Sequence, residues 1–263
     1  KLPADQLLPL DRWICSRAGD LQAELEAAYE TYQFHQVFHR IHNFCGGELG
    51  GFYLDIIKDR QYTTQVESHA RRSAQTAMWH LAEALFRWIA PILSFTAEEI
   101  WENLPGSRER SVFLSSWYAD LPAEIADGNL GNAFWDEVIT VRQAVNRALE
   151  ARRAAGDLRG SLDAEVTLYA EHGLFNRLQQ LGSELRFVLI TSEATLKPVA
   201  EAPADIVESD VAGLAVAVAV SSHEKCQRCW HRRPDVGDSK EHPTLCTRCI
   251  DNIEGPGEHR QYA

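Results

Sequence analysis

Residues 70–92, ARRSAQTAMWHLAEALFRWIAPI, carry the clearest helical pattern in the chain. Their apolar side chains recur at intervals of three and four residues, which places them on one face of an α-helix. Such a face is typical of a helix that packs against a hydrophobic core. Pro91 lacks a backbone N–H and therefore predicts that the helix ends near this residue. The apolar face consists of Ala74, Met78, Leu81, Leu85, Trp88 and Ile92.

The sequence on either side of this segment predicts further helices. A second helix should stop at Gly46-Gly47, because paired glycines favour a helix end. Thr96 to Glu99 has the pattern of a capping box and predicts the start of a short helix. We therefore expect residues 1–155 to form an antiparallel bundle of about five helices. Apolar spacing marks residues 10–29, 37–44, 49–57, 96–101 and 138–149 as its other helical segments.

The pattern changes in residues 156–222, which we expect to form a small α/β module. Glu165 to Tyr169 alternates polar and apolar residues, as a half-buried strand does. Leucines spaced through residues 174–185 predict a helix. The apolar run Phe187 to Ile190 predicts a buried strand, and Val211 to Val220 predicts another. A loop from Pro198 to Asp210 should separate these last two strands.

Four cysteines near the end of the chain form two Cys-x2-Cys knuckles. Cys226 and Cys229 make the first knuckle, and Cys246 and Cys249 make the second. Four thiolates at this spacing can surround one structural Zn²⁺ tetrahedrally. The alternatives are two disulfides or free thiols, but disulfides need an oxidising compartment and the chain opens without a secretory signal. We define residues 223–263 as the metal module.

Basic and aromatic side chains surround both knuckles. Such residues suit RNA, whose phosphates attract cations and whose unpaired bases stack on aromatic rings. For Trp230 the alternative is a structural role, because small metal-bound modules have few other side chains to bury. The candidate RNA-binding residues of the metal module are Arg228, Trp230, Arg232, Arg233 and Arg248.

The last helix of the bundle offers two further candidates. Arg142 and Arg153 are eleven residues apart, about three helical turns, so they share a face that could follow a phosphate backbone. The alternative is an ordinary solvated helix face. Nearer the start, Lys58, Asp59 and Arg60 alternate in charge, which favours an internal salt-bridge network.

Composition limits the kind of protein. The 263 residues are 45% hydrophobic and 24% charged, which is ordinary for a globular protein without membrane spans. The formal net charge of -12 argues against binding nucleic acid over the whole surface, so a polyanion should meet local basic areas. The absence of an initiator Met, and of a complete catalytic constellation, leads us to expect a part of a longer protein. A cytoplasmic monomer is the default expectation.

Specific strings resemble a known family. Residues 10–13, 52–60, 71–76 and 90–101 resemble the helical anticodon-binding domain of the class I isoleucyl-tRNA synthetases. Residues 225–230, 236–237 and 245–249 are similar to the zinc finger that ends the bacterial members of this family. The resemblance covers essentially the whole chain, and the strings follow the order found in the family.

The resemblance implies a function for the chain. It would be the C-terminal part of the synthetase, binding the anticodon stem-loop of isoleucine tRNA (tRNA-Ile) beside the catalytic body of the same protein. The intact protein would join isoleucine to this tRNA using ATP. Strings like His-Ile-Gly-His and Lys-Met-Ser-Lys-Ser, which mark the family's catalytic domain, are absent from this chain. The chain itself should therefore bind RNA and catalyse nothing.

Three other interpretations remain open. The chain could be a stand-alone zinc-containing RNA-binding module descended from the same region. The four-cysteine pattern is also similar to the finger of formamidopyrimidine-DNA glycosylases, although those enzymes need a catalytic N-terminal proline and this chain begins with Lys1. Valyl-tRNA synthetases share the helical domain but resemble the C-terminal part poorly.

Overall fold

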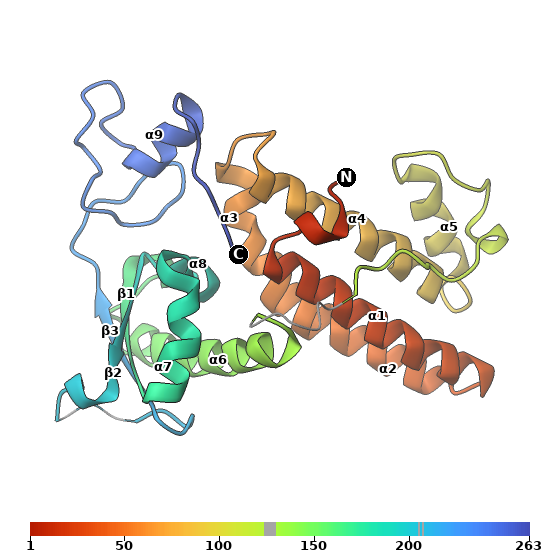
Figure 1. Ribbon diagram of the computed structural model, residues 1–263, viewed down its shortest axis with the longest axis horizontal. Helices are drawn as coiled ribbons and strands as arrows, with labels where there is room; N and C mark the ends of the chain where they lie inside the picture. Colours follow the sequence, from red (N-terminus) through yellow and green to blue (C-terminus); the bar gives the residue numbers. More distant parts are fainter. Residues whose placement is uncertain (124–129, 205, 207) are drawn as a thin grey trace. The chain divides into compact units, whose positions relative to one another are not determined.

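The computed structural model describes residues 1–123, 130–204, 206 and 208–263 (Figure 1). In this part of the chain, helices predominate, and a small sheet and a four-cysteine cluster follow them, which confirms the expected fold class. Two compact units are present. The first unit comprises residues 1–55 and 72–132, and the second comprises residues 56–71 and 133–263. The described helices include none that is long and apolar enough to cross a membrane.

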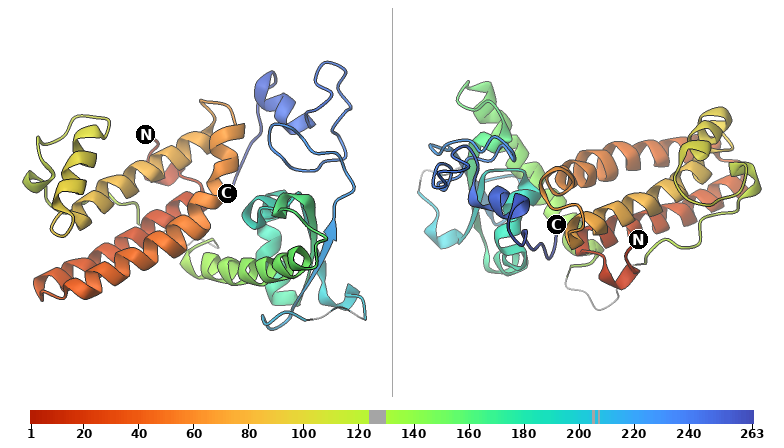
Figure 2. Two further views of the ribbon diagram at one scale, coloured as in Figure 1. Left: turned by 180° about the vertical axis from the view of Figure 1, so that it is seen from behind. Right: turned by 90° about the horizontal axis from the view of Figure 1, so that it is seen from above.

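The first unit is built around a helical hairpin. The long helix α1 (Pro9–Glu30) and helix α2 (Phe34–Phe44) contact each other and run in opposite directions (Figures 1 and 2). Helix α4 (His69–Ile89) and helix α5 (Ser94–Asn103) follow later in the chain. Tyr32 takes a positive φ of 56° in the turn between α1 and α2. The predicted long helices are therefore present, and α4 ends before Pro91 as expected.

The glycines after α2 do not end the helical path. Residues Cys45–Leu54 form a π-helix that leads directly into α3 (Asp55–Thr63). A Cβ atom on Gly50 would lie 2.7 Å from the carbonyl oxygen of Cys45, so this wide turn requires glycine. The prediction of a stop at Gly46-Gly47 was wrong because glycine here permits a wider helix.

Buried polar groups join the helices of the first unit. The carboxylate of Asp11 accepts hydrogen bonds from the hydroxyls of Tyr53, at 2.7 Å, and Ser73. The indole of Trp88, which is fully buried, donates to the side chain of Gln22 at 2.9 Å. These bonds satisfy polar atoms that would otherwise be costly to bury, so they fix which helices meet.

The start of α5 differs from the prediction. The helix begins at Ser94, and Leu93 at its N-cap makes no side-chain capping bond. The predicted capping box at Thr96 was therefore wrong. Glu98, in the same segment, accepts hydrogen bonds from the hydroxyl of Ser111 and the backbone N–H of Val112, at 2.9 and 3.0 Å. It ties the chain after α5 back onto the helix.

The second unit contains the α/β module. Helix α6 (Asn132–Ala154) precedes strand β1 (Ala164–Ala170), which lies between β2 (Glu193–Pro198) and β3 (Leu214–Val220). Strand β1 is parallel to β2 and antiparallel to β3. Helices α7 (His172–Leu178) and α8 (Leu185–Leu189) pack against the sheet (Figure 1). Short 3₁₀ helices cover Ala4–Gln6, Val112–Leu114, Ser161–Asp163, Gln179–Glu184 and Val199–Glu201.

One predicted strand is a helix. Residues 187–189 belong to α8, and Ile190 ends that helix in the left-handed region with a φ of 55°. The strand forms immediately afterwards, at Glu193–Pro198, and ends at the first residue of the predicted loop. A short apolar run is compatible with either structure, and packing against the sheet decides between them. The strands predicted near residues 165–169 and 211–220 are present.

The two compact units divide the chain differently from the predicted domains. Those boundaries were residues 1–155, 156–222 and 223–263, whereas the structure groups α6, part of α3, the α/β module and the metal module together. Which segments fold independently stays a prediction. The last helix of the chain, α9 (Thr247–Ile253), lies in the metal module.

Candidate metal centre and nucleic-acid interface

The four predicted ligands meet in the metal module. The sulfur atoms of Cys226, Cys229, Cys246 and Cys249 all lie within 4.8 Å of one another, and the four residues are buried. The sulfurs of Cys229 and Cys246 are 3.8 Å apart. A tetrahedral zinc site with Zn–S bonds of about 2.3 Å separates its sulfurs by about 3.8 Å. The cluster therefore fits one structural Zn²⁺.

Local backbone geometry presents the sulfurs of the first knuckle. The N–H of Trp230 donates to the carbonyl of Cys226 at 2.9 Å, and the N–H of Cys226 donates to the carbonyl of His231 at 2.9 Å. These bonds close a tight turn in which Trp230 takes a positive φ of 67°.

The second knuckle continues into a helix. Cys246 is the N-cap residue of α9, and its N–H donates to the sulfur of Cys226 at 3.4 Å. The next N–H, of Thr247, donates to the carboxylate of Asp235 at 2.7 Å. The backbone thus joins the two knuckles directly and holds the second one at the start of a helix.

The module has histidines that do not join the cysteine cluster. His231 is buried, and burial lowers its pKa to about 3, although the Asp59 carboxylate 3.8 Å away opposes this shift. His242 lies 2.8 Å from a carboxylate oxygen of Glu254. Among the described residues, the four cysteines are the group of potential metal ligands that comes together.

Trp230 is the most exposed of the candidate RNA-binding residues in the module. Its side chain is 60% exposed, although it follows a buried zinc ligand directly. The ammonium group of Lys225 lies 5.4 Å from the centre of its ring. The knuckle therefore holds a flat aromatic surface in the solvent, with a cation beside it.

The arginines of the first knuckle and the segment after it make internal contacts. Arg228 donates to the carbonyl of Thr63 at 2.6 Å. Arg232 binds the carboxylate of Asp163 at 2.7 Å, and Arg233 binds that of Glu193 at 2.6 Å. These last two pairs attach the metal module to the α/β module.

The remaining candidates are divided between the interior and the surface. Arg248 has only 12% of its side chain exposed and binds the carboxylates of Asp59 and Glu258. Arg142 is 6% exposed, which argues against direct contact with RNA. Arg153 lies on the surface of α6, where it pairs with Glu150 at 2.8 Å. The shared face predicted for Arg142 and Arg153 is therefore not a uniformly exposed one.

Sequence reasoning missed the partners of Arg248. The internal network predicted around Asp59 is confirmed, but its cations come from the metal module and the C-terminal segment. Arg260 and Glu258, which complete the network, lie in a segment that carried no recognised pattern. The alternation of charge in residues 58–60 was the only signal of this network.

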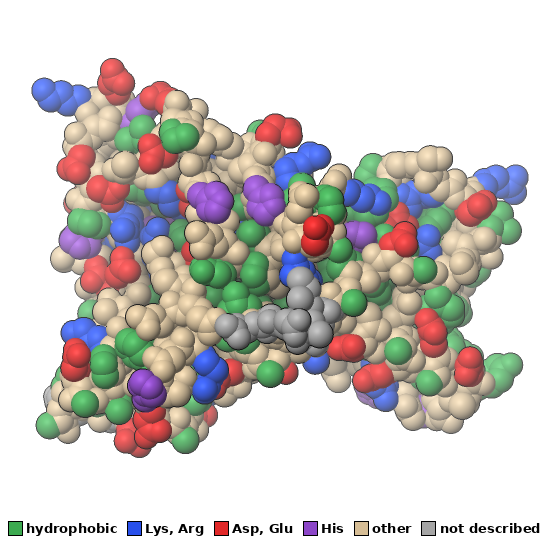
Figure 3. Space-filling model, in the orientation of Figure 1, with side chains coloured by type: hydrophobic (Ala, Val, Ile, Leu, Met, Phe, Trp, Pro, Cys, Tyr) green, Lys and Arg blue, Asp and Glu red, His purple; other side chains and the backbone are tan. Residues whose placement is uncertain are grey.

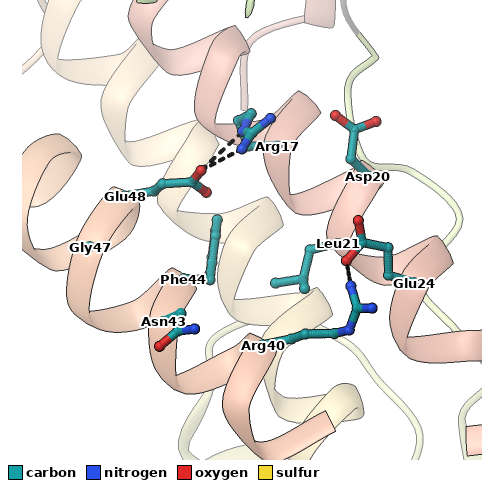
Figure 4. Close-up of a pocket in the computed structure, with 9 residues that line it drawn as sticks. All are labelled: Arg17, Asp20, Leu21, Glu24, Arg40, Asn43, Phe44, Gly47 and Glu48. Atoms are coloured by element: carbon teal, nitrogen blue, oxygen red, sulfur yellow. Dashed lines mark hydrogen bonds and ion pairs between the residues drawn. The ribbon is translucent and has the colours of Figure 1, made fainter. Parts of the chain in front are cut away.

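A polar pocket of about 300 Å³ lies in the first unit, between α1 and the segment from α2 into the π-helix (Figure 4). Arg17 pairs with Glu48 across it at 2.6 Å, and Arg40 pairs with Glu24. Since its arginines are already matched by carboxylates, the pocket lacks the excess positive charge that a phosphate group requires. On the face shown in Figure 3, acidic and basic side chains are likewise interspersed.

Comparison with known proteins gives two matches to family models. One model, described as the anticodon-binding domain of tRNA ligase, matches residues 11–168. The other, described as a zinc finger found in FPG and IleRS, matches residues 224–252. The second match contains all four cysteines of the cluster.

Curated relatives match along the whole chain. Isoleucine–tRNA ligases from Alcanivorax borkumensis and Stutzerimonas stutzeri are each 59% identical over 262 residues, covering 100% and 99% of this chain. The same enzyme from Pseudomonas paraeruginosa is 60% identical over 262 residues and covers 100% of it. The chain spans 28% of the length of each of these relatives.

Proposed function

Because this chain belongs to the family of anticodon-binding domains of tRNA ligases, we propose that it binds the anticodon stem-loop of isoleucine tRNA. The whole protein would then be an isoleucine–tRNA ligase that works as a cytoplasmic monomer. ATP and isoleucine would bind in its catalytic body, outside the segment that this chain represents. The chain's own contribution is to hold the tRNA.

The observation that carries this proposal is the exposed indole of Trp230 on the zinc knuckle. An unpaired base can stack on this ring, and Lys225 beside it can contact a phosphate. The zinc fixes the ring by holding the neighbouring cysteine, so it has a structural role without a chemical step. Stacking on a ring that is already fixed costs little conformational entropy.

The arginines support this arrangement in different ways. Arg228, Arg232 and Arg233 orient the first knuckle through internal bonds, and Arg153 remains available on the surface of α6 for a phosphate. Residues 223–263 contain seven basic and seven acidic residues, and four thiolates around one Zn²⁺ would add a charge of about -2. Local cations such as Lys225, and not the net charge of the module, would therefore attract a phosphate.

A glycosylase function is less well supported. The finger model also covers FPG proteins, but residues 11–168 match the anticodon-binding domain. A stand-alone RNA-binding module would use the same surface, yet the relatives carry this region within much longer ligases. The ligase assignment accounts for both family matches.

The test is binding of the zinc-loaded chain to isoleucine tRNA, with a tRNA altered only in its anticodon as competitor, at two salt concentrations. We expect a preference for the native anticodon that survives added salt, since phosphate contacts alone are sensitive to salt. Trp230→Ala should weaken binding about 5- to 150-fold, the range for loss of one stacked base. Val220→Ala, which removes a 45% exposed apolar side chain from β3, outside both family matches, is the control. Equal affinity for both tRNAs would contradict the proposal.

A further inference from the structure

The carboxylate of Asp59 lies at the centre of a buried ion cluster in the second unit. Asp59, on helix α3, accepts hydrogen bonds from both terminal nitrogens of Arg248, at 2.7 and 2.9 Å. Arg260 donates to the same carboxylate at 2.5 Å. The exposed side-chain fractions of the three residues are 16%, 12% and 2%. Water therefore competes little for these bonds.

A second carboxylate balances the charge of this cluster. Glu258 lies 3.1 Å from a nitrogen of Arg248 and 2.9 Å from one of Arg260. Two carboxylates thus face two guanidinium groups. Burial would raise the pKa of Asp59, but Arg248 and Arg260 hold it well below its usual range. Asp59 stays ionised, and its removal would leave buried positive charge without a partner.

Both arginines of the cluster belong to the metal module, so the cluster connects this module to Asp59 on helix α3. Arg248 lies between the two cysteines of the second knuckle, and Arg260 lies in the C-terminal segment. The ring of Phe187, in α8, lies under both guanidinium groups, 5.0 Å from Arg248 and 3.3 Å from Arg260. The carboxylate of Glu184 holds the end of the segment by accepting three backbone N–H groups, those of Gln261, Tyr262 and Ala263.

Helix α3 also contacts the first knuckle. The guanidinium of Arg228 donates to the carbonyl of Thr63 in the last turn of α3. In the following loop, the amide of Gln65 donates to the carbonyl of Gly255 at 2.9 Å. Figures 1 and 2 show the end of α3 and the loop after it beside the metal module. Both knuckles are therefore attached to one short stretch of chain, residues 59–65.

We propose that Asp59 is a positioning residue, which fixes the metal module on α3 and thereby sets the orientation of Trp230 toward RNA. This inference rests on the proposed function of the chain. Asp59 touches no RNA itself. It acts through Arg248, which lies between the zinc ligands Cys246 and Cys249. Because one Zn²⁺ would bind the cysteines of both knuckles, fixing the second knuckle also fixes the position of the first.

Asp59→Asn tests the proposal, since it removes the charge and keeps the size of the side chain. Glu67→Gln removes one exposed charge from the loop after α3 and is the matched control. We expect Asp59→Asn to keep one zinc per chain and to accelerate hydrogen exchange in residues 225–233. Its affinity for isoleucine tRNA should fall roughly tenfold, the scale of one misplaced stacked base. Glu67→Gln should change neither quantity.

A double-mutant cycle separates positioning from general destabilisation. In a Trp230→Ala background, Asp59→Asn should weaken RNA binding by less than about twofold, because both changes remove the same contact. An equal tenfold loss in both backgrounds, or release of the zinc by Asp59→Asn, would overturn the proposal. If Asp59→Asn does not fold, Arg260→Met removes the opposite side of the cluster. It should give the same pattern, and wild-type exchange and affinity in that variant would overturn the proposal.

The outcomes also distinguish this inference from the proposed function. A wild-type chain that shows no preference for the isoleucine anticodon would contradict the function. The exchange of residues 225–233 in the zinc-loaded variants would still show whether Asp59 fixes the knuckle. Faster exchange in Asp59→Asn than in Glu67→Gln is the expected result there, and equal exchange would overturn the role of Asp59.

Discussion

The two cysteine knuckles have the same sequence pattern and different surroundings. Each has an arginine just before its second cysteine, Arg228 in the first knuckle and Arg248 in the second. Both arginines are of intermediate exposure, but Arg228 donates to a backbone carbonyl, whereas Arg248 pairs with two carboxylates in an ion cluster. The residues that follow differ as well, since Trp230 is 60% exposed and Ile250 lies within α9.

This comparison separates two roles within one metal site. Spacing of the cysteines determines that a metal binds, and it is equal in both knuckles. Contacts outside the knuckles determine what each one does: the second attaches the module to α3 through an ion cluster, and the first, which is hydrogen-bonded to α3 through Arg228, presents an aromatic ring to the solvent. The same residue type is therefore part of an ion cluster in one knuckle and close to the proposed RNA-binding surface in the other.

Loss of a zinc ligand should remove the difference between the knuckles altogether. Structural zinc in small modules contributes about 10–16 kcal/mol of binding free energy at neutral pH. We expect Cys246→Ser to unfold the metal module, leave the first unit helical and weaken tRNA binding strongly. Zinc content and hydrogen exchange resolved by segment measure this. Protection of residues 223–263 that persists without metal would contradict it.

Replacing each of the two arginines should lower the free energy of unfolding of the metal module by a different amount. Arg248→Gln breaks a buried ion pair, and the free energy of unfolding of the metal module should fall by about 3–5 kcal/mol. Arg228→Gln loses a hydrogen bond to a carbonyl and should cost about 1 kcal/mol. Denaturant unfolding of the two zinc-loaded variants, followed by zinc release, compares them directly. Similar costs would mean that the surroundings of the knuckles are equivalent.

Trp230 should show opposite effects on stability and on binding. A non-glycine residue at positive φ costs about 1–2 kcal/mol, so Trp230→Gly should slow zinc release while abolishing the stacking contact. Trp230→Ala keeps a non-glycine residue at this unfavourable positive φ and also loses the stacking contact. Zinc release and RNA affinity, measured on both variants, test this. Faster zinc release from the glycine variant would show that the ring stabilises the knuckle.

The smallest effect is expected outside the metal module. Arg153 is exposed and pairs with the surface carboxylate of Glu150, three residues away, so Arg153→Gln should change stability by less than about 0.5 kcal/mol. If this residue contacts a phosphate, the slope of log affinity against log salt should decrease by about one. Titrations of RNA at several salt concentrations measure this slope. An unchanged slope would restrict RNA binding to other cations.

The metal ligands could be predicted from the sequence because the information is local. A Cys-x2-Cys turn brings two sulfurs together whatever surrounds it, and the metal joins the two pairs. The role of Arg248 could not be predicted in this way, since Asp59 lies 189 residues earlier in the chain. Charge pattern alone made Arg248 an RNA-binding candidate, whereas the fold places it in an ion pair.

The same distinction applies to the fold. Long apolar stripes predicted α1 and α4, because many residues repeat one period. The π-helix after α2 was missed, since glycine usually marks a helix end and here allows a wider one. The run Phe187 to Ile190 is too short for its period to distinguish a helix from a strand, and its packing on the sheet decided the outcome.

The most direct test of the account is anticodon preference before zinc removal, after chelation and after reloading. We expect the zinc-loaded chain to prefer isoleucine tRNA over a tRNA altered only in its anticodon. Chelation should abolish this preference and added zinc should restore it, because the metal would fix Trp230. A chelated chain that keeps its full preference would contradict the claim that the metal module reads the RNA.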